Sequence, residues 1–196
     1  MKNSTTYSVP NTSLVSNYIA KWNADPILVG NNKALDKLFA QVYPTNTAVE
    51  EVLVKVITLN CLFSTRVLDK DIQTVTACIV GIANMDARLK AGDISLVKEL
   101  CRAFGQSKLK EYQSFASKYC AFHNPDAFPP YDRFVRFVLQ QYCRQKVLKN
   151  IKITSLDDYN VYVYAIDQLK KQYGLNPNYR ELDHWLWLMG KGVTLP

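Results

Sequence analysis

Apolar positions recur at helical spacing along most of the chain. This spacing predicts helices near residues 12–23, 70–82, 93–104, 111–123, 131–148 and 178–190. Alternating strand pairs joined by tight Asn-Gly or Asp-Gly turns do not occur. The pattern therefore predicts an all-α fold.

Three further helices are predicted from their start and stop signals. Thr47-x-x-Glu50 has the form of a capping box and opens an apolar run over 49–62, whose Val and Ile content leaves a strand as the alternative. Ser155-x-x-Asp158 opens an amphipathic stretch that ends before Gly174. Asn31 or Asn32 is predicted to cap a helix that runs through Val42.

Length and composition favour one folded domain of two lobes. The 196 residues are 48% hydrophobic and 21% charged, which is enough apolar surface to offset chain entropy. The core lobe is expected over about 47–150, with residues 1–46 and 151–196 packing together as a second lobe.

Composition also sets expectations about compartment and metal. No apolar run is long enough to cross a membrane, and residues 1–10 lack the apolar stretch of a signal peptide, so a cytoplasmic location is predicted. The five cysteines are widely spaced without a CxxC, which indicates reduced thiols. With two histidines and no Cys-His spacing, we predict no metal site and no cofactor.

The positive charge is concentrated in one segment. Residues 98–152 hold eleven lysines and arginines against four acidic residues, whereas the segments before and after are nearly balanced. A localised basic stretch is typical of a protein that binds a phosphate backbone, and a solvated helix face is the alternative.

Two residues in this segment have the chemistry of a nucleophile and its partner. Lys118 lies among apolar residues, where desolvation favours the neutral amine that attacks an electrophile. Asp132 follows a Pro-Pro-Tyr turn at a helix start, where backbone amides favour a carboxylate. Viewed as structural residues, they are a lysine with a solvated amine and an ordinary N-cap.

The same stretch resembles the helix-hairpin-helix DNA glycosylase superfamily, and within it the bacterial proteins with an 8-oxoguanine glycosylase fold. Residues 114–118, Ser-Phe-Ala-Ser-Lys, lie where that family has its Gly-Val-Gly-x-Lys hairpin. Residues 130–135, Pro-Tyr-Asp-Arg-Phe-Val, lie where it has Pro-Val-Asp-x-His-Val. The runs 52–65 and 181–191 resemble its early helix and its aromatic ending. Both hairpin glycines and the histidine are replaced here, the latter by Phe134.

The resemblance implies a DNA glycosylase/AP lyase that excises an oxidised purine from double-stranded DNA. Lys118 would attack the sugar and form a Schiff base, and Asp132 would stabilise the developing positive charge. The implied DNA contacts are Asn60, Thr65, Arg66, Ser114, Ser117, Arg133 and Arg136. The implied base pocket consists of Phe63, Phe122, Trp185 and Trp187.

Other assignments remain open at this stage. Trp185 and Trp187 at helical spacing also suit a helix docked by its aromatic face. A catalytically inactive nucleic-acid-binding protein would keep the fold and the basic face, and a helical scaffold for a protein partner would keep the fold alone. The glycosylase is expected to act as a monomer without a cofactor.

Overall fold

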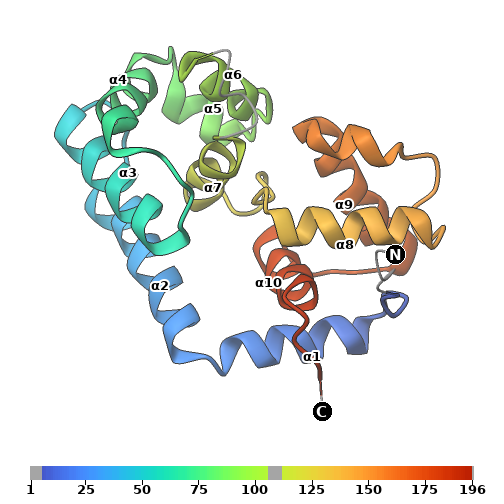
Figure 1. Cartoon of the computed structure of the whole chain (residues 1–196). Helices are drawn as coiled ribbons and strands as arrows, with labels where there is room; N and C mark the ends of the chain where they lie inside the picture. The colour runs from blue at the N-terminus through green and yellow to red at the C-terminus, as the bar shows by residue number, and fades with distance from the viewer. Residues whose placement is uncertain (1–5, 106–111, 196) are drawn as a thin grey trace. The chain divides into compact units, whose positions relative to one another are not determined.

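The chain folds into helices throughout the part that is described. A computed structural model describes residues 6–105 and 112–195, and every regular element in these ranges is helical (Figure 1). The all-α prediction is confirmed. No helix in the described ranges has the length and apolar character needed to cross a membrane.

The chain divides into two compact units, which we call the central unit and the discontinuous unit. The central unit is Pro26–Pro130, and the discontinuous unit joins Met1–Asp25 to Tyr131–Pro196. The lobes expected from sequence had later boundaries, near residues 47 and 150. The observed divisions coincide with prolines, since Pro26 begins a helix and Pro130 lies in the non-helical loop that precedes the helix starting at Arg133.

The central unit begins with two linked helical segments and a long buried helix. Helix α2 (Pro26–Lys37) continues as a π-helical turn η1 (Leu38–Val42), and α3 (Val49–Phe63) follows a short loop. Asn31 and Asn32 lie inside α2, so the predicted cap there is wrong: Pro26 at the first helical position sets the start. Ala48 is the N-cap of α3 and makes no side-chain cap bond, so the predicted capping box at Thr47 does not form either.

The second half of the central unit surrounds one helix that is buried along nearly its whole length. Its elements are η2 (Asp69–Asp71), α4 (Ile72–Gly81), α5 (Met85–Ala91), α6 (Ser95–Ala103) and α7 (Gln113–His123). Every residue of α7 from Phe115 to Phe122 is buried, and the helix packs against α3, α5 and α6. A side chain on α7 is therefore held in place on several sides.

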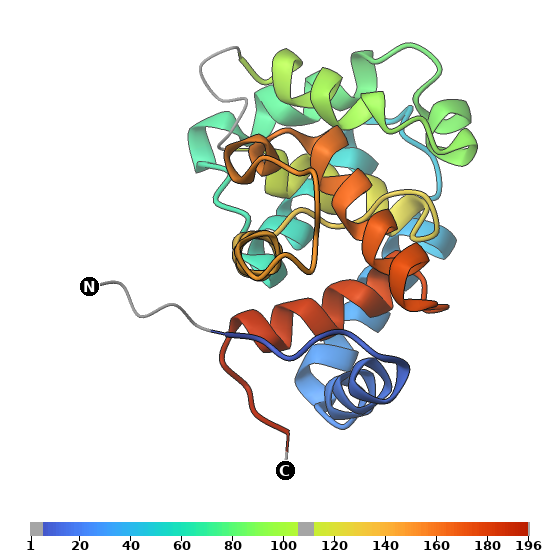
Figure 2. The same ribbon diagram turned by 90° about the vertical axis from the view of Figure 1, so that its right-hand side faces the viewer.

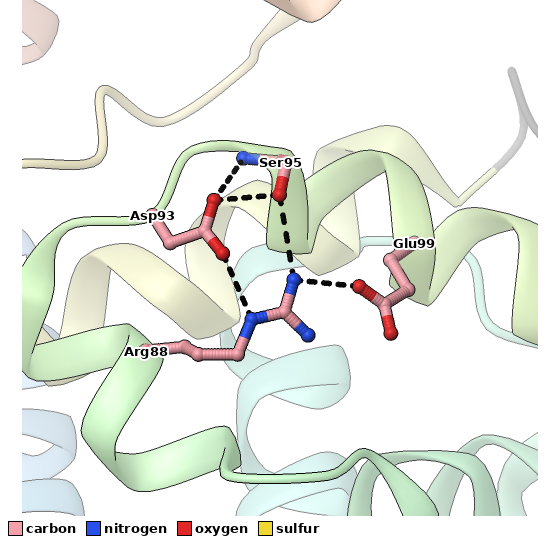
Figure 3. Close-up of polar contacts among 4 residues, drawn as sticks. All are labelled: Arg88, Asp93, Ser95 and Glu99. Carbon is pink, nitrogen blue, oxygen red and sulfur yellow. Dashed lines mark hydrogen bonds and ion pairs between the residues drawn. The ribbon is translucent and has the colours of Figure 1, made fainter.

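A polar network joins α5 to α6 (Figure 3). Arg88 Nε lies 2.8 Å from Asp93 Oδ2, and its terminal nitrogen lies 2.6 Å from Glu99 Oε2. The Ser95 hydroxyl donates to Asp93, and this bond, followed by the bond from Arg88, lowers the pKa of the Asp93 carboxyl. Because the Arg88 guanidinium forms ion pairs with both Asp93 and Glu99, we interpret the network as a structural link between the two helices.

The discontinuous unit brings the two ends of the sequence together. Its elements are α1 (Thr12–Asn23), α8 (Arg133–Arg144), the 3-10 segment η4 (Ile153–Asp157), α9 (Tyr159–Tyr173) and α10 (Tyr179–Gly190). Helix α10 packs against both α1 and α8, and α1 and α10 lie side by side in both views (Figures 1 and 2). The Tyr18 hydroxyl donates to the Val193 carbonyl, and the Trp22 ring stacks on His184 at 3.9 Å between centroids.

Helix ends in this unit follow their sequence signals closely. Asn178 and Glu181 form a capping box at the start of α10. The predicted end of α9 at Tyr173 is confirmed, with Gly174 at φ 60° as its C-cap. Asp158, the acid of the motif Ser155-x-x-Asp158, is itself the N-cap of α9, because residues 153–157 form a 3-10 turn before it.

Candidate functional site

Lys118 lies in the middle of the buried helix α7. Its side chain is 5% exposed, and its Nζ lies 2.8 Å from the Ser114 hydroxyl one turn earlier. A lysine that is this buried does not extend its amine into bulk water. The alternative of a structural lysine with a solvated amine therefore does not describe Lys118. The Ser114 hydroxyl on the same helix accepts a hydrogen bond from the amine inside the packed unit.

The residues expected in a hairpin are helical. Ser114, Ala116 and Ser117 all belong to α7, which starts at Gln113. Ser117 is fully buried and its hydroxyl donates to the Ser114 carbonyl, which is a position inside the protein and not one facing a DNA phosphate. Lys108 and Lys110, two lysines of the basic segment 98–152, lie outside the described residues.

Asp132 occupies the N-cap of α8 in the discontinuous unit. Its carboxylate accepts a 2.8 Å hydrogen bond from the Phe134 backbone N–H. The predicted position of the carboxylate at a helix start is confirmed. Arg133 beside it is exposed, whereas Arg136 forms an ion pair with Asp157.

The loop after α3 is organised by Asn60. The Asn60 amide donates to the Val67 carbonyl at 2.9 Å, and its Oδ1 accepts from the Thr65 hydroxyl and the Val67 N–H. Thr65 is 3% exposed, so both residues stabilise the loop from inside. Ser64 and Arg66 take positive φ values of 48° and 66°, and Arg66 is the predicted contact that the loop exposes.

The four predicted pocket aromatics divide between the units. Phe63 and Phe122 contact each other in the central unit, with ring centroids 5.6 Å apart. Trp185 and Trp187 lie on α10; Trp185 is completely buried, as expected for a residue that docks the helix. Trp187 is half-buried and packs edge-on against Trp22.

The central unit also contains a buried polar cluster that the sequence did not single out. Lys55 of α3 is completely buried, and its Nζ lies 2.7 Å from both the Thr45 carbonyl and Asn46 Oδ1. His123 Nε2 is 3.4 Å from the same nitrogen, and the Tyr119 hydroxyl donates to Asn46 Oδ1. The signal in the sequence was a lysine inside the stretch 52–59, whose other residues are apolar except Thr58.

Burial controls the protonation of this cluster. It lowers the pKa of Lys55 to about 8, with Asp86 and Glu51 acting in the opposite direction. It lowers the pKa of His123 to about 3, and the nearby Lys55 contributes to that shift. His123 is therefore neutral at physiological pH and accepts from Lys55, so it orders this region and does not donate a proton.

Comparison with known proteins places the chain in a family. A family model described as the HI_0787 N-terminal domain matches residues 14–127, more than half of the sequence. The chain belongs to this family. It is also similar to an uncharacterized protein of Haemophilus influenzae, with 36% identity over 148 residues that cover 76% of this chain and 70% of that protein. No solved structure matches the chain.

The HI_0787 N-terminal domain match contains only part of the candidate site. Lys55, Asn60 and Lys118 lie within the matched residues, whereas Asp132 and Trp187 follow them. Among the described residues, no group of three or more His, Cys, Asp or Glu side chains is arranged to hold a metal ion.

The Asn60 contacts lead to a prediction about the exposed loop of this family member. Asn60→Ala removes three hydrogen bonds to the loop, so we expect trypsin to cleave after Arg66 several-fold faster, with a loss of about 1–3 kcal/mol in unfolding free energy. Cleavage is followed by mass spectrometry of the fragments. Asn60→Asp keeps the acceptor for Thr65 and should have a smaller effect; equal cleavage of wild type and Asn60→Ala would show that Asn60 does not hold the loop.

Proposed function

We propose that the protein is a DNA glycosylase/AP lyase that removes an oxidised purine from double-stranded DNA through a Schiff base on Lys118. The observation that carries the proposal is the Lys118 amine, buried on a central helix and held by the Ser114 hydroxyl. Asp132 follows it in sequence at the start of α8, in the lysine-then-aspartate order of the helix-hairpin-helix glycosylases. We also propose that the helices of this all-α fold are arranged as in the helix-hairpin-helix glycosylases.

The proposed reaction begins with a base flipped out of the duplex, at a cost of a few kcal/mol in lost stacking. The Lys118 amine attacks C1′ of the sugar and gives up a proton, and the bond from C1′ to the base breaks with its electron pair going to the base, which takes up a proton. The sugar ring then opens to give an imine between Lys118 Nζ and C1′. Loss of a C2′ proton expels the 3′ phosphate and cleaves the strand.

The remaining residues have supporting parts in this proposal. The Asp132 carboxylate stabilises positive charge that develops on the sugar. Phe63 and Phe122 offer apolar surface to the flipped base, and Arg66 reaches the DNA from its exposed loop. The proposed reaction needs one copy of the chain and no group other than its own side chains.

Borohydride trapping tests the proposal. The protein is incubated with a duplex containing one 8-oxoguanine, and separately with an abasic duplex, and reduction of the imine is detected as a covalent protein–DNA adduct. We expect wild type to give adducts on both duplexes and Lys118→Gln to give none, since an amide nitrogen does not attack C1′. Asp132→Asn should lower the adduct rate by about 10²–10³-fold.

The matched control is Lys90→Gln, which removes an exposed lysine from α5 and should trap like wild type. Circular dichroism checks that each variant is folded. Adducts that persist in Lys118→Gln, or their absence in wild type on both duplexes, would overturn the mechanism. Adducts on the abasic duplex alone would contradict the glycosylase half of the proposal.

A catalytically inactive nucleic-acid-binding protein is the second candidate. The observation that favours it is that both proposed catalytic groups have structural partners, with Ser114 for Lys118 and the Phe134 N–H for Asp132. It predicts salt-dependent DNA binding that is unchanged in Lys118→Gln, with no adduct from any variant.

A further inference from the structure

We propose that a surface of the discontinuous unit, formed by Arg133, Phe134, Trp187 and Lys191, binds an unpaired strand of nucleic acid. We call it the cation–aromatic surface. The proposal does not depend on Lys118, which lies in the central unit, so it stands or falls separately from the glycosylase reaction.

The packing of α8 against α10 builds this surface. A Cβ atom placed on Gly190 would lie 2.6 Å from the Phe134 carbonyl oxygen, so the end of α10 approaches the start of α8 as closely as backbone allows. This approach sets Lys191 Nζ 4.6 Å from the centre of the Phe134 ring and 5.0 Å from the Trp187 ring. The Arg133 guanidinium carbon lies 4.6 Å from the centre of the same Phe134 ring.

The two cations are exposed. Among the described residues, neither Arg133 nor Lys191 forms an ion pair with a carboxylate. The nearest carboxylate in sequence, Asp132, accepts from the Phe134 backbone N–H. Two accessible cations that form no ion pair within residues 6–105 and 112–195 are suited to an anionic partner.

The charge continues along the chain beyond this surface. From Arg133 through Leu156 the sequence contains six lysines and arginines, Arg133 included, and no aspartate or glutamate. Arg144, Lys146, Lys149 and Lys152 in this stretch are exposed. Several exposed cations along one stretch match a partner whose negative charges repeat regularly, such as a phosphate backbone, better than they match a single small anion.

Aromatic groups at the same place indicate that the strand is unpaired. Phe134 and Trp187 are half-buried, and each carries a cation over its ring. Bases of a single strand stack on aromatic rings and on guanidinium planes, whereas the faces of paired bases are covered by their neighbours in a duplex.

Fluorescence anisotropy with a short labelled oligodeoxythymidine tests the proposal. We expect the Arg133→Gln/Lys191→Gln double variant and Phe134→Leu each to weaken binding by about tenfold. Lys171→Gln, which removes an exposed cation from α9, is the charge control and should change binding by less than about twofold. Both glutamine substitutions are at exposed positions, so the double variant tests the surface without depending on core packing.

Tryptophan emission gives a second readout. Trp22 is 4% exposed and Trp185 is completely buried, so quenching by the oligonucleotide should come from Trp187 and disappear in Trp187→Phe. Binding by the two test variants that matches wild type, or absence of any binding, would overturn the proposal. If a duplex binds the protein as tightly as the single strand does, and if Phe134→Leu weakens both complexes equally, the assignment to an unpaired strand would be overturned.

Discussion

Gly190→Ala is expected to lower the unfolding free energy of the discontinuous unit by about 2–3 kcal/mol. The added methyl carbon would lie 2.6 Å from the Phe134 carbonyl oxygen and 2.8 Å from the carbonyl carbon, and backbone atoms cannot rotate away as a side chain can. The helices α8 and α10 must separate to admit it. Denaturant unfolding followed by tryptophan emission measures the effect, because all three tryptophans belong to this unit.

Gly30→Ala provides a matched control for the same chemical change. Gly30 is in α2, and a Cβ placed there meets nothing within 4 Å. Since alanine is the better helix former in open space, this variant should be unchanged or more stable by about 0.4–1 kcal/mol. Equal effects of the two substitutions would show that the α8–α10 approach is looser than the contact at Gly190 implies.

Lys55→Met is expected to destabilise the central unit by about 1–3 kcal/mol at pH 7, and by more at pH 9.5. The substitution keeps an apolar stem beside Phe39 and Tyr119 but removes the donor to the Thr45 carbonyl and Asn46. The pH dependence follows from a pKa of about 8 for Lys55 in the folded protein, against an ordinary value of 10.5. Between these values the unfolded chain binds more protons, so wild type gains stability as pH rises through this window, and Lys55→Met does not.

The measurement is the difference in unfolding free energy between wild type and Lys55→Met at several pH values from 7 to 9.5. His123 and Tyr119 do not titrate in this range, because burial lowers the pKa of His123 to about 3 and raises that of Tyr119 well above 10. Lys33→Met, at an exposed position of α2, should show no comparable pH dependence. A pH-independent difference for Lys55→Met would mean that Lys55 titrates as an ordinary lysine.

The existence of a helix could be predicted where apolar residues recur at helical spacing. The ends of a helix were predicted less well where they depend on contacts with other parts of the fold. The predictions near 12–23 and 178–190 match α1 and α10 to within a residue, since Asn11 and Asn178 cap them locally. Thr47 is not the cap because α3 begins at Val49, one residue later than the motif requires, which makes Ala48 the N-cap. The start of α2 was readable from Pro26, a residue that suits the first helical position.

The site was harder to predict, because its contacts come from residues far apart in sequence. The Lys55 cluster brings together α3, the preceding loop and the end of α7, and no periodicity relates Asn46 or Tyr119 to Lys55. Burial of Lys118 could be anticipated from its apolar neighbours. The burial of Ser117 and Thr65 could not be anticipated, because small hydroxyl side chains are common both inside proteins and at DNA phosphates.

The discontinuous order of the chain also affects how the protein is made on the ribosome. The central unit is one continuous stretch, so all of its partners have been synthesised once Pro130 has emerged. Helix α1 is translated before it but packs against α10, which follows the central unit in sequence. At roughly 5–20 residues per second, the apolar side of α1 spends roughly 10–30 seconds without its partner in the nascent chain, which makes it a natural point of contact for chaperones.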